Sequence, residues 1–422
     1  MRIFRETCTA IVSVVLVASL SGCQEGLLRY EAGALNGYTL VDRVGLDLPA
    51  HLIDMQGNVI HISTSEALFT KMMPGGSMLT TVDRRLLTAY AEGVSLLQED
   101  WYGTVEWTFR EWEHSPLDGW VSRCHHDLQR EGNPVGYYAP GQDHVEQGNT
   151  LVLAHADETR LEISSIPLVD DIIYEVDWEG NPVFEWHAAD HVDEFGFDAA
   201  ARAAIDSFGG DWLHVNSVSW LGENPWYNDG DTRFHPRNII LCSRHGCFLA
   251  IIDHQTGDVV WRVGPDYSDG NPEAALGPII APHHAHMIPA GLPGEGNILL
   301  VDNGGHSGYG GPQGGISKYT RDYTRVVEFD PRSLQIVWEY SPANGDYLPF
   351  SEFCNSAQRL PNGNTLITSG LSRIVLEVTP DRDVVWECYF SVTLPLFRVY
   401  RAYRVPPQWL PENPAGYSPW IL

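Results

Sequence analysis

The sequence predicts an all-β protein, a six-bladed β-propeller whose ring is closed by pairing of its C-terminal and N-terminal strands. Three observations predict this fold: a turn-and-strand motif recurs six times, a second strand motif recurs upstream of the later copies, and the composition favours short strands. The chain has 422 residues, with 40 glycines, 27 prolines and 11% aromatic residues. Glycine and proline mark turns, and aromatic residues favour strands. Since an all-β domain of this size can form one unit, we expect residues 23–422 to form a single propeller domain.

The first motif is a tight turn followed by a strand that ends in tryptophan or an equivalent residue. The six copies are Gly57–His61, Gly103–Trp107, Gly180–Trp186, Gly257–Trp261, Ser333–Trp338 and Arg382–Trp386. Each later copy follows an alternating strand that ends in a polar turn, such as Phe248–Asp253, which is the pattern of a β-hairpin. Six closing strands predict six blades, and we expect the repeated tryptophans to pack between the blades.

The second motif is a turn with asparagine that leads into an apolar strand. Its copies are Gly148–Leu153, Asn238–Leu241, Gly296–Val301 and Gly363–Ile367. Before each copy comes a short strand that opens with polar residues, at His125, His214, His283 and Asn355. Four strands in each repeat are typical of a propeller blade.

The two ends of the chain are expected to complete the first blade together. Residues 397–405 alternate between apolar and polar side chains, and we expect them to join strands within 39–43 and 50–62. This closure leaves no long exposed sheet edge. The repeats differ in length, so the extra residues must form long loops, which often cover or build a site in a compact domain. The longest loops are expected at 187–212, 222–236, 265–282 and 302–323.

Residues 1–22 are expected to be a bacterial lipoprotein signal peptide. Arg2 and Arg5 precede a short apolar stretch, and small residues then lead to Cys23. The stretch is shorter than the about 20 apolar residues that span a bilayer. We therefore expect a lipid on Cys23 to be the only membrane anchor, and the protein to lie in the periplasm or cell envelope. The pattern does not show whether the anchor lies in the inner or the outer membrane.

Five cysteines follow the proposed lipidation site: Cys124, Cys242, Cys247, Cys354 and Cys388. An odd number permits at most two disulfides in an oxidising compartment. Cys242 and Cys247 flank a tight segment, and the sequence leaves open whether they pair or act as small buried hydrophobic residues.

The net charge of −29 excludes most nucleic-acid binding, which depends on basic surfaces. An acidic exterior also repels anionic substrates. Such a substrate would need a local cluster of histidine and arginine to draw it in. The charge does not define the oligomeric state.

Polar residues open the first strand of several predicted blades. These strands line the central channel of a propeller, so residues far apart in the sequence would converge there. The candidates are His125 or His126, His214 with Asn216, His283 and Asn355–Ser356, and Arg244 would lie near the same mouth. Imidazole, guanidinium and amide groups gathered in one place favour a functional site.

Three chemistries suit a histidine cluster. A metal site is disfavoured by the spacing of His283, His284 and His286, because only His284 and His286 would lie on the same face of their strand. A quinone-dependent redox site lacks the tryptophan docking signature of such propellers. Nucleophilic catalysis fits best, because one neutral imidazole can attack while the other groups hold and neutralise an anion.

Four strings in this region resemble the bacterial arylsulfotransferases: Asp211–Ser217, Ser243–His245, His283–Ala285 followed by Gly296–Gly304, and Ser356–Thr365. The resemblance covers roughly residues 120–405, and the combination of strings is specific. Members of that family are six-bladed periplasmic propellers. They move a sulfuryl group from a phenolic sulfate ester to another phenol, without a nucleotide sulfate donor.

The resemblance implies a role for each matching residue. The histidine that accepts the sulfuryl group falls on His283, and the arginine that binds the sulfate falls on Arg244. The histidine–asparagine pair of the family falls on His214 and Asn216, which the resemblance implies would bind the substrate and stabilise charge on the sulfuryl oxygens together with Arg244. Pro282 stands before His283 where the family usually has glutamine.

A further channel histidine of the family falls on His126, with His125 as the competing choice, and a hydroxyl residue falls on Ser356. The implied mechanism has two steps, in which His283 takes the sulfuryl group from an aryl sulfate and a phenol then receives it. Such a reaction predicts ping-pong kinetics. It requires no metal and no organic cofactor.

Two other functions compete with this interpretation. One is a non-catalytic envelope propeller that binds a glycan or a protein partner, which explains the lipid anchor but not the polar convergence. The other is a metal-dependent hydrolase. Turnover of an aryl sulfate with and without a phenol, and with and without a chelator, separates the three.

Overall fold

The computed structural model describes residues 26–44, 48–66, 68–85, 92–133, 135–309, 318–391 and 398–420. The predicted signal peptide, residues 1–22, and Cys23 lie outside this part. Strands form most of the regular structure, as predicted. Within the described ranges, no helix is long and apolar enough to cross a membrane.

Four separate antiparallel sheets each hold one predicted repeat. The first contains β30 (Arg398–Val405), β2 (Tyr38–Val44), β3 (His51–Ile53) and β4 (Val59–Ile62). The second contains β16 (Val215–Trp220), β17 (Ile239–Ser243), β18 (Phe248–Ile252) and β19 (Val259–Val263). The third contains β20 (His283–Met287), β21 (Ile298–Asp302), β24 (Arg325–Phe329) and β25 (Ile336–Tyr340). The fourth contains β26 (Asn355–Arg359), β27 (Thr365–Ser369), β28 (Ile374–Val378), β29 (Val384–Tyr389) and, on its outer edge, β1 (Gly26–Tyr30).

The remaining repeats form one nine-stranded sheet. Its first run contains β5 (Leu68–Met72), β6 (Met78–Arg84), β7 (Gly93–Glu99) and β8 (Val105–Phe109). Its second run contains β11 (Cys124–Arg130), β12 (Thr150–Glu158), β13 (Leu168–Val176), β14 (Pro182–His187) and the short β15 (Gly210–Asp211). One backbone pair, Cys124 with Gly93, joins the two runs.

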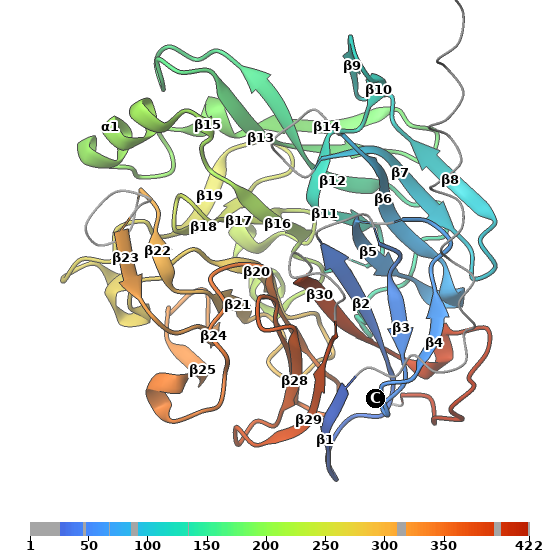
Figure 1. The fold of residues 1–422 in the computed structure, drawn as a ribbon. Coiled ribbons are helices and arrows are strands. Elements are labelled where there is room, and N and C mark those ends of the chain that lie inside the picture. Colours follow the sequence, from blue (N-terminus) through green and yellow to red (C-terminus); the bar gives the residue numbers. More distant parts are fainter. Residues whose placement is uncertain are drawn as a thin grey trace, which may run out of the picture.

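The arrangement is therefore a β-propeller with four separate blades, and the prediction of six separate blades is not met. The difference comes from the single pairing between β11 and β7, which merges two repeats into one sheet. The first strands of all the repeats nevertheless contact their neighbours in a closed ring (Figure 1), in the order β5, β11, β16, β20, β26 and β30.

The C-terminal strand closes the ring as the sequence predicts. Strand β30 pairs with β2 along its whole length, from Val405 opposite Tyr38 to Arg398 opposite Val44. Figure 1 shows the red β30 beside the blue β2. The closure removes two sheet edges at the first blade.

The predicted long loops contain short elements of their own. Among them are the helices α1 (Ala199–Phe208) and α2 (Pro225–Asn228) and the hairpin of β22 (Gly305–Ser307) and β23 (Lys318–Arg321). A second small hairpin joins β9 (Glu113–Ser115) and β10 (Gly119–Val121). Single 3-10 turns are η1 (Pro74–Gly76), η2 (Ala188–His191), η3 (Thr232–Phe234), η4 (Pro272–Leu276), η5 (Pro342–Asn344) and η6 (Pro407–Trp409).

The hydrophobic core lies between neighbouring sheets. In one cluster, Leu249 and Ile251 of β18 pack with Met287 of β20 and Leu300 of β21. The five cysteines of the described part are free, so the possible Cys242–Cys247 disulfide is not formed. Both of these thiols are buried and belong to the apolar interior.

The repeated tryptophans join neighbouring repeats, as predicted. Each indole N–H donates to a backbone carbonyl in a turn of the next repeat, at 2.8–3.0 Å. The pairs are Trp107 with Trp178, Trp186 with Gly257, Trp261 with Pro331, Trp338 with Pro380, and Trp386 with Met55. In the first repeat, His61 takes the tryptophan position and its ring stacks on Trp101 at 3.8 Å. The motif thus marks one contact between each repeat and the next.

We expect Trp261→Phe to lower the free energy of unfolding by about 1–3 kcal/mol, because it leaves the carbonyl of Pro331 without its donor. Urea unfolding monitored by circular dichroism measures the change. The control is Trp120→Phe, whose side chain is 46% exposed and should change stability by less than about 0.5 kcal/mol. Equal losses in the two variants would contradict the proposed contact between repeats.

Candidate active site

Four inner strands are irregular at the end where the predicted site lies. Register shifts interrupt β5, β11, β16 and β20. Non-glycine residues with positive φ accompany them: Phe69 (61°), His126 (56°), His214 (50°) and His284 (53°). A bulge re-aims side chains that would otherwise alternate between faces. Backbone conformations of this kind are uncommon for bulky residues and often mark functional sites.

Three histidines lie against one another at this end of the ring. The ring centres of His126 and His214 are 4.8 Å apart, and those of His214 and His245 are 5.0 Å apart. His126 also stacks on Phe69 at 5.7 Å. The structure therefore places His126 in the cluster. His125 lies completely buried behind it, with 2.7 Å between their Nδ1 atoms.

His283 opens β20, and the contacts around its ring define which nitrogen carries hydrogen. Nδ1 lies 3.1 Å from the carbonyl oxygen of Ala281, which only accepts hydrogen bonds. Nδ1 therefore donates, and Nε2 keeps a lone pair. Burial lowers the pKa of His283 well below its usual value, and the positive charge of Arg244 adds to this effect. The imidazole is neutral at pH 7.

Asn216 holds the backbone on both sides of His283. Its Nδ2 donates to the carbonyl of Pro282 at 2.8 Å, and its Oδ1 accepts from the N–H of His284 at 3.4 Å. The side chain is completely buried. Asn216 thus lies in the predicted place, and its contacts in the structure are those of a positioning residue.

His214 precedes β16 and has a carboxylate partner. Its Nδ1 lies 2.5 Å from Oδ2 of Asp211. Burial tends to raise the pKa of Asp211, but the histidines around it, His214 first, hold that pKa well below its usual value. Asp211 is therefore ionised and fixes the orientation of the His214 ring.

Arg244 follows β17, as predicted, and His245 positions it. The guanidinium donates to Nε2 of His245 at 2.8 Å, and Nδ1 of His245 donates to the carbonyl of Asp211 at 3.1 Å. Burial and the neighbouring His214 lower the pKa of His245 to about 3, so it accepts from Arg244 as a neutral ring. Nε of Arg244 has no hydrogen-bond partner in the described part of the chain.

Ser356 does not join this cluster through any contact of its hydroxyl group. The hydroxyl donates to Oγ1 of Thr368 on the next strand at 3.0 Å, and the side chain is buried. Asn355 caps the same region by donating to the carbonyl of Ser351 at 2.7 Å. The structure thus brings together His126, His214, Asn216, Arg244 and His283, and leaves Ser356 aside.

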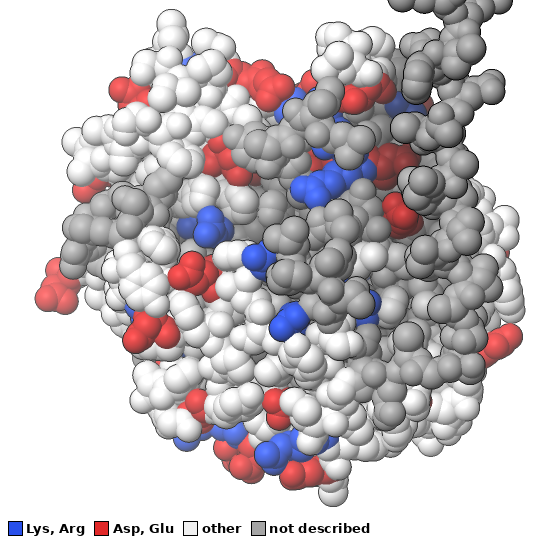
Figure 2. Space-filling view, in the orientation of Figure 1, with Lys and Arg blue, Asp and Glu red and all other residues white. Residues whose placement is uncertain are grey.

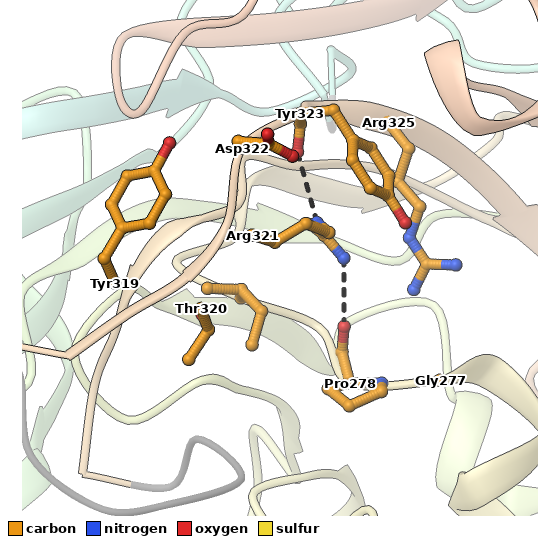
Figure 3. A pocket seen from close by; sticks show the side chains of 9 residues that line it. Gly277, Pro278, Tyr319, Thr320, Arg321, Asp322, Tyr323 and Arg325 are labelled. Carbon is orange, nitrogen blue, oxygen red and sulfur yellow. Dashed lines mark hydrogen bonds between the residues drawn. The ribbon is translucent and has the colours of Figure 1, made fainter.

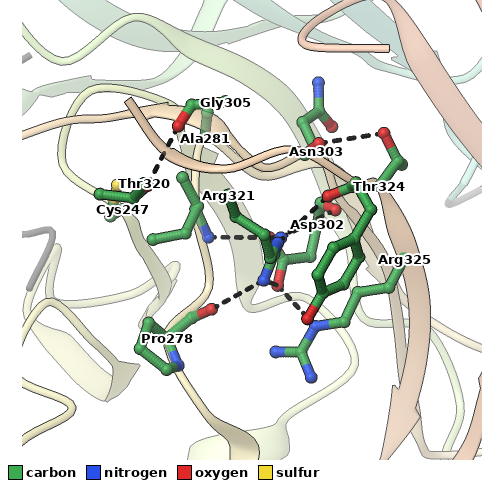
Figure 4. A network of polar contacts seen from close by, with 12 residues as sticks. Cys247, Pro278, Ala281, Asp302, Asn303, Gly305, Thr320, Arg321, Thr324 and Arg325 are labelled. Atoms are coloured by element: carbon green, nitrogen blue, oxygen red, sulfur yellow. Dashed lines mark hydrogen bonds and ion pairs between the residues drawn. The ribbon is translucent and has the colours of Figure 1, made fainter. Parts of the chain in front are cut away.

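A polar network anchors the segment that leads to His283. Asp302 accepts from the N–H of Ile280 at 2.8 Å and from Nε of Arg325 at 2.8 Å (Figure 4). Arg321 pairs with the same carboxylate and donates to the carbonyl of Pro278. The buried carboxylate therefore holds residues 278–280 in place.

The same arginines border a pocket of about 530 Å³, lined by residues of the segments 277–280 and 319–325 (Figure 3). Both of its arginines pair with Asp302, and Arg325 also pairs with Glu339. Figure 2 shows several Lys and Arg side chains towards the middle of the drawn face, and acidic side chains across it and along its edges.

The sequence analysis did not identify Asp211 or the role of His245. It also did not identify three buried charged residues, Lys71, Asp127 and Arg401. The motif Asp211–Ser217 contained the signal for the first, because a carboxylate three residues before a histidine can contact it. His245 lies in the turn after β17, and Lys71, Asp127 and Arg401 lie inside strands, where nothing in the sequence separates them from residues of an ordinary polar face.

The closed ring of strands and its histidine–arginine mouth define a β-propeller protein with a site suited to an anionic group. The profile of the arylsulfotransferase (ASST) family matches residues 51–385. The chain belongs to the arylsulfotransferase family. Comparison with curated protein sequences gave no significant match.

Solved structures with a similar fold share little sequence with this chain. A protein of unknown function from Bacteroides caccae is 12% identical over 88% of this chain and 99% of its own, with a TM-score of 0.46. A streptogramin B lyase is 10% identical over 87% of both chains, with a TM-score of 0.39. The Dos1 propeller is 11% identical over 87% of this chain and 76% of its own, with a TM-score of 0.37.

We expect the buried histidines to make stability fall in mild acid. Burial lowers the pKa of His286 to about 4. Between pH 6.5 and 4, the unfolded chain then binds a proton there that the folded chain does not, so the free energy of unfolding decreases as the pH falls. One such group contributes a slope of about 1.4 kcal/mol per pH unit.

His286→Gln removes this proton difference, and we expect its stability to decline less steeply than that of the wild type by about that slope. Urea unfolding of the wild type and the variant at several pH values, from roughly 4.5 to 6, measures how steeply the stability of each depends on pH. Parallel curves would show that His286 binds its proton equally in both states.

Proposed function

We propose that the protein transfers a sulfuryl group from a phenolic sulfate ester to a phenolic acceptor through a sulfurylated His283. One observation carries this proposal: the imidazole of His283 is neutral, its Nδ1 is held by the carbonyl of Ala281, and its Nε2 keeps the lone pair. A nucleophile needs this protonation state, and a nearby guanidinium favours it. The family match supports the choice of sulfur chemistry.

In the first step, Nε2 of His283 attacks sulfur while the bond between sulfur and the phenolic oxygen breaks. The leaving phenolate takes a proton from His214. His126 does not supply it, because burial lowers the pKa of His126 well below its usual value. Arg244 stabilises the charge on the sulfuryl oxygens, and Asn216 keeps His283 in position. Preorganised donors of this kind account for a large part of catalysis in buried sites.

In the second step, the oxygen of an acceptor phenol attacks the same sulfur, and the bond between sulfur and Nε2 breaks. The phenol gives its proton to the imidazole that was deprotonated in the first step, which restores the site. The reaction needs no metal, organic cofactor or nucleotide donor. His214 and Arg244 act on both half-reactions, because the group that serves as acid in the first must serve as base in the second.

The same proposal includes a six-bladed ring. The nine-stranded sheet consists of a four-strand run and a five-strand run joined by one backbone pair, and their inner strands β5 and β11 occupy separate places in the ring. With the four separate sheets, these two runs give six repeats around the centre.

The location of the protein in the cell is also a proposal. Residues 1–22 have the pattern of a lipoprotein signal, and Cys23 would carry the lipid that anchors the protein in the cell envelope. Aryl sulfates and phenols are small molecules that reach such a site from outside the cytoplasm. Two measurements test this location: whether globomycin blocks processing of the chain, and whether Cys23→Ser abolishes its association with the membrane.

The experiment for the transfer reaction measures phenol release from a chromogenic aryl sulfate, with and without an added phenol. We expect release that depends on the acceptor, shows ping-pong kinetics, and falls by at least about 10³-fold in His283→Ala. The control is His187→Gln on the outer strand β14, which should keep wild-type turnover. Release that needs no acceptor but is lost with a chelator favours hydrolysis, and unchanged release in His283→Ala rejects His283 as the nucleophile.

A second variant tests the proton donor. Asp211→Asn removes the carboxylate that orients His214. We expect kcat to fall by about 10²-fold for a phenol with a high pKa and by less for a nitrophenol, because a good leaving group needs less protonation. A series of aryl sulfates measures this dependence. An equal loss for all leaving groups would assign Asp211 a structural role only.

A further inference from the structure

We propose that the protein binds a neutral oligosaccharide at the end of the ring opposite the histidine cluster. Two adjoining pockets lie there, of about 140 Å³ and about 520 Å³, and Pro74 and His144 line both of them. The larger pocket has the volume of an ordinary small-molecule site. This binding is separate from the transfer chemistry of His283 and does not depend on it.

The position of the pockets follows from the direction of the inner strands. His126 lies near the start of β11, within the histidine cluster, whereas Gly132 and Asn133 follow the end of the same strand and line the small pocket. Pro74 and Trp409 also line it, and they follow the ends of β5 and β30. The turns after three inner strands therefore build this pocket, at the far end of the ring.

One loop, residues 135–146, closes the ring at this end and also forms part of the small pocket. Its Tyr137 is 1% exposed and belongs to the hydrophobic core. The next residue, Tyr138, lines the pocket instead. The N–H of Gly141 donates to the carbonyl of Ala290, in the turn after β20, at 3.3 Å. The loop is thus fixed on both sides, and the pocket is formed before a ligand binds.

Aromatic rings form much of the walls. In the small pocket, Tyr138 packs edge-to-face against Trp409, with 6.0 Å between the ring centres. Trp101 and Tyr102 line the larger pocket. Tyr102 is 72% exposed, so its ring is available to a ligand. An aromatic ring presents a flat apolar face, on which the C–H groups of a sugar can pack while its hydroxyl groups form hydrogen bonds.

The charges in the larger pocket exclude anionic ligands. Asp100, Glu106 and Glu146 line it, and no lysine or arginine is among the described residues that do so. Carboxylates accept hydrogen bonds from hydroxyl groups, and three of them together repel an anion. A sulfate ester, a phosphate or an acidic sugar would therefore bind poorly. A neutral sugar and a cation remain.

Three polar atoms in the wall of the small pocket favour the sugar over the cation. Oδ1 of Asn133, Nε2 of Gln142 and Nδ1 of His144 have no hydrogen-bond partner in the described part of the chain. The oxygen of Asn133 can only accept, and the nitrogen of Gln142 can only donate. A hydroxyl group does both, whereas an ammonium group only donates. Gln142 and His144 are partly exposed, so a small rotation about a side-chain bond presents these atoms to a ligand.

The backbone around the small pocket favours a sugar over a peptide. A peptide also offers donors and acceptors, but an extended peptide gains most of its hydrogen bonds by pairing with a free strand edge. None of the residues that line the small pocket lies in a strand. The pocket therefore suits a compact ring with hydroxyl groups on its edge.

The experiment titrates the purified protein with three neutral trisaccharides, maltotriose, cellotriose and triacetylchitotriose, by isothermal titration calorimetry. We expect at least one of them to bind with a Kd below about 1 mM. Trigalacturonic acid, which is anionic, and spermidine, which is cationic, should not bind. Absence of binding by all three neutral sugars at about 10 mM overturns the proposal, as does binding of the acid or of spermidine in their place.

Two variants and a matched control test whether the sugar occupies these pockets. Tyr102→Ala and His144→Ala should each weaken binding by about 5-fold or more, because each removes a side chain that contacts the ligand. The control is Tyr347→Ala, whose ring is 53% exposed and lies outside both pockets. Equal affinity in all of these proteins would overturn the proposal. His283→Ala should lose turnover and keep its affinity for the sugar, so the two proposals can fail separately.

Discussion

The rest of the structure depends on one buried carboxylate, Asp127, and on the two cations that neutralise it. Lys71 reaches it from β5 at 3.0 Å, and Arg401 reaches it from the C-terminal strand β30 at 2.9 Å. All three side chains are at most 3% exposed. Removing the carboxylate of such a group leaves the buried cations uncompensated, which costs about 3–5 kcal/mol. The group joins β5 and β11 to the C-terminal strand β30, so the strand that closes the ring also contributes to the charges at its centre.

One of these cations, Arg401, contacts the proposed site through Asn216. Arg401 donates to the backbone carbonyl of Asn216 at 2.6 Å, and the side chain of Asn216 holds the backbone on both sides of His283. On the opposite side, Asp302 and its arginines hold the segment that precedes His283. His283 is thus fixed from the ring centre and from the outer strands. Its position is a property of several repeats together.

The sequence was sufficient for the parts of the fold that repeat. The tryptophan at the end of each hairpin makes the same contact in each repeat, so it recurs regularly along the sequence. Aligning the repeats on this tryptophan also indicated the polar residues that open the inner strands, such as His214 and His283. The sequence did not show the merging of two repeats, because that depends on one backbone pair, Cys124 with Gly93. It also did not show the bulges, because the residues with positive φ, such as His126 and His284, are not glycines. Side chains inside strands, such as His155, have partners that lie far away in the sequence, and the spacing of residues along the chain does not show them.

The charges around the histidines explain how an acidic protein can suit an anionic substrate. A guanidinium beside an imidazole attracts a sulfate and also keeps the imidazole deprotonated, so Arg244 favours both binding and a nucleophilic His283. The structure places a carboxylate, Asp211, against His214 instead. Two rings of the same kind therefore have different partners: Arg244 lies beside His283, and Asp211 contacts His214. The division into nucleophile and proton donor that we propose rests on these partners and requires no difference between the histidines themselves.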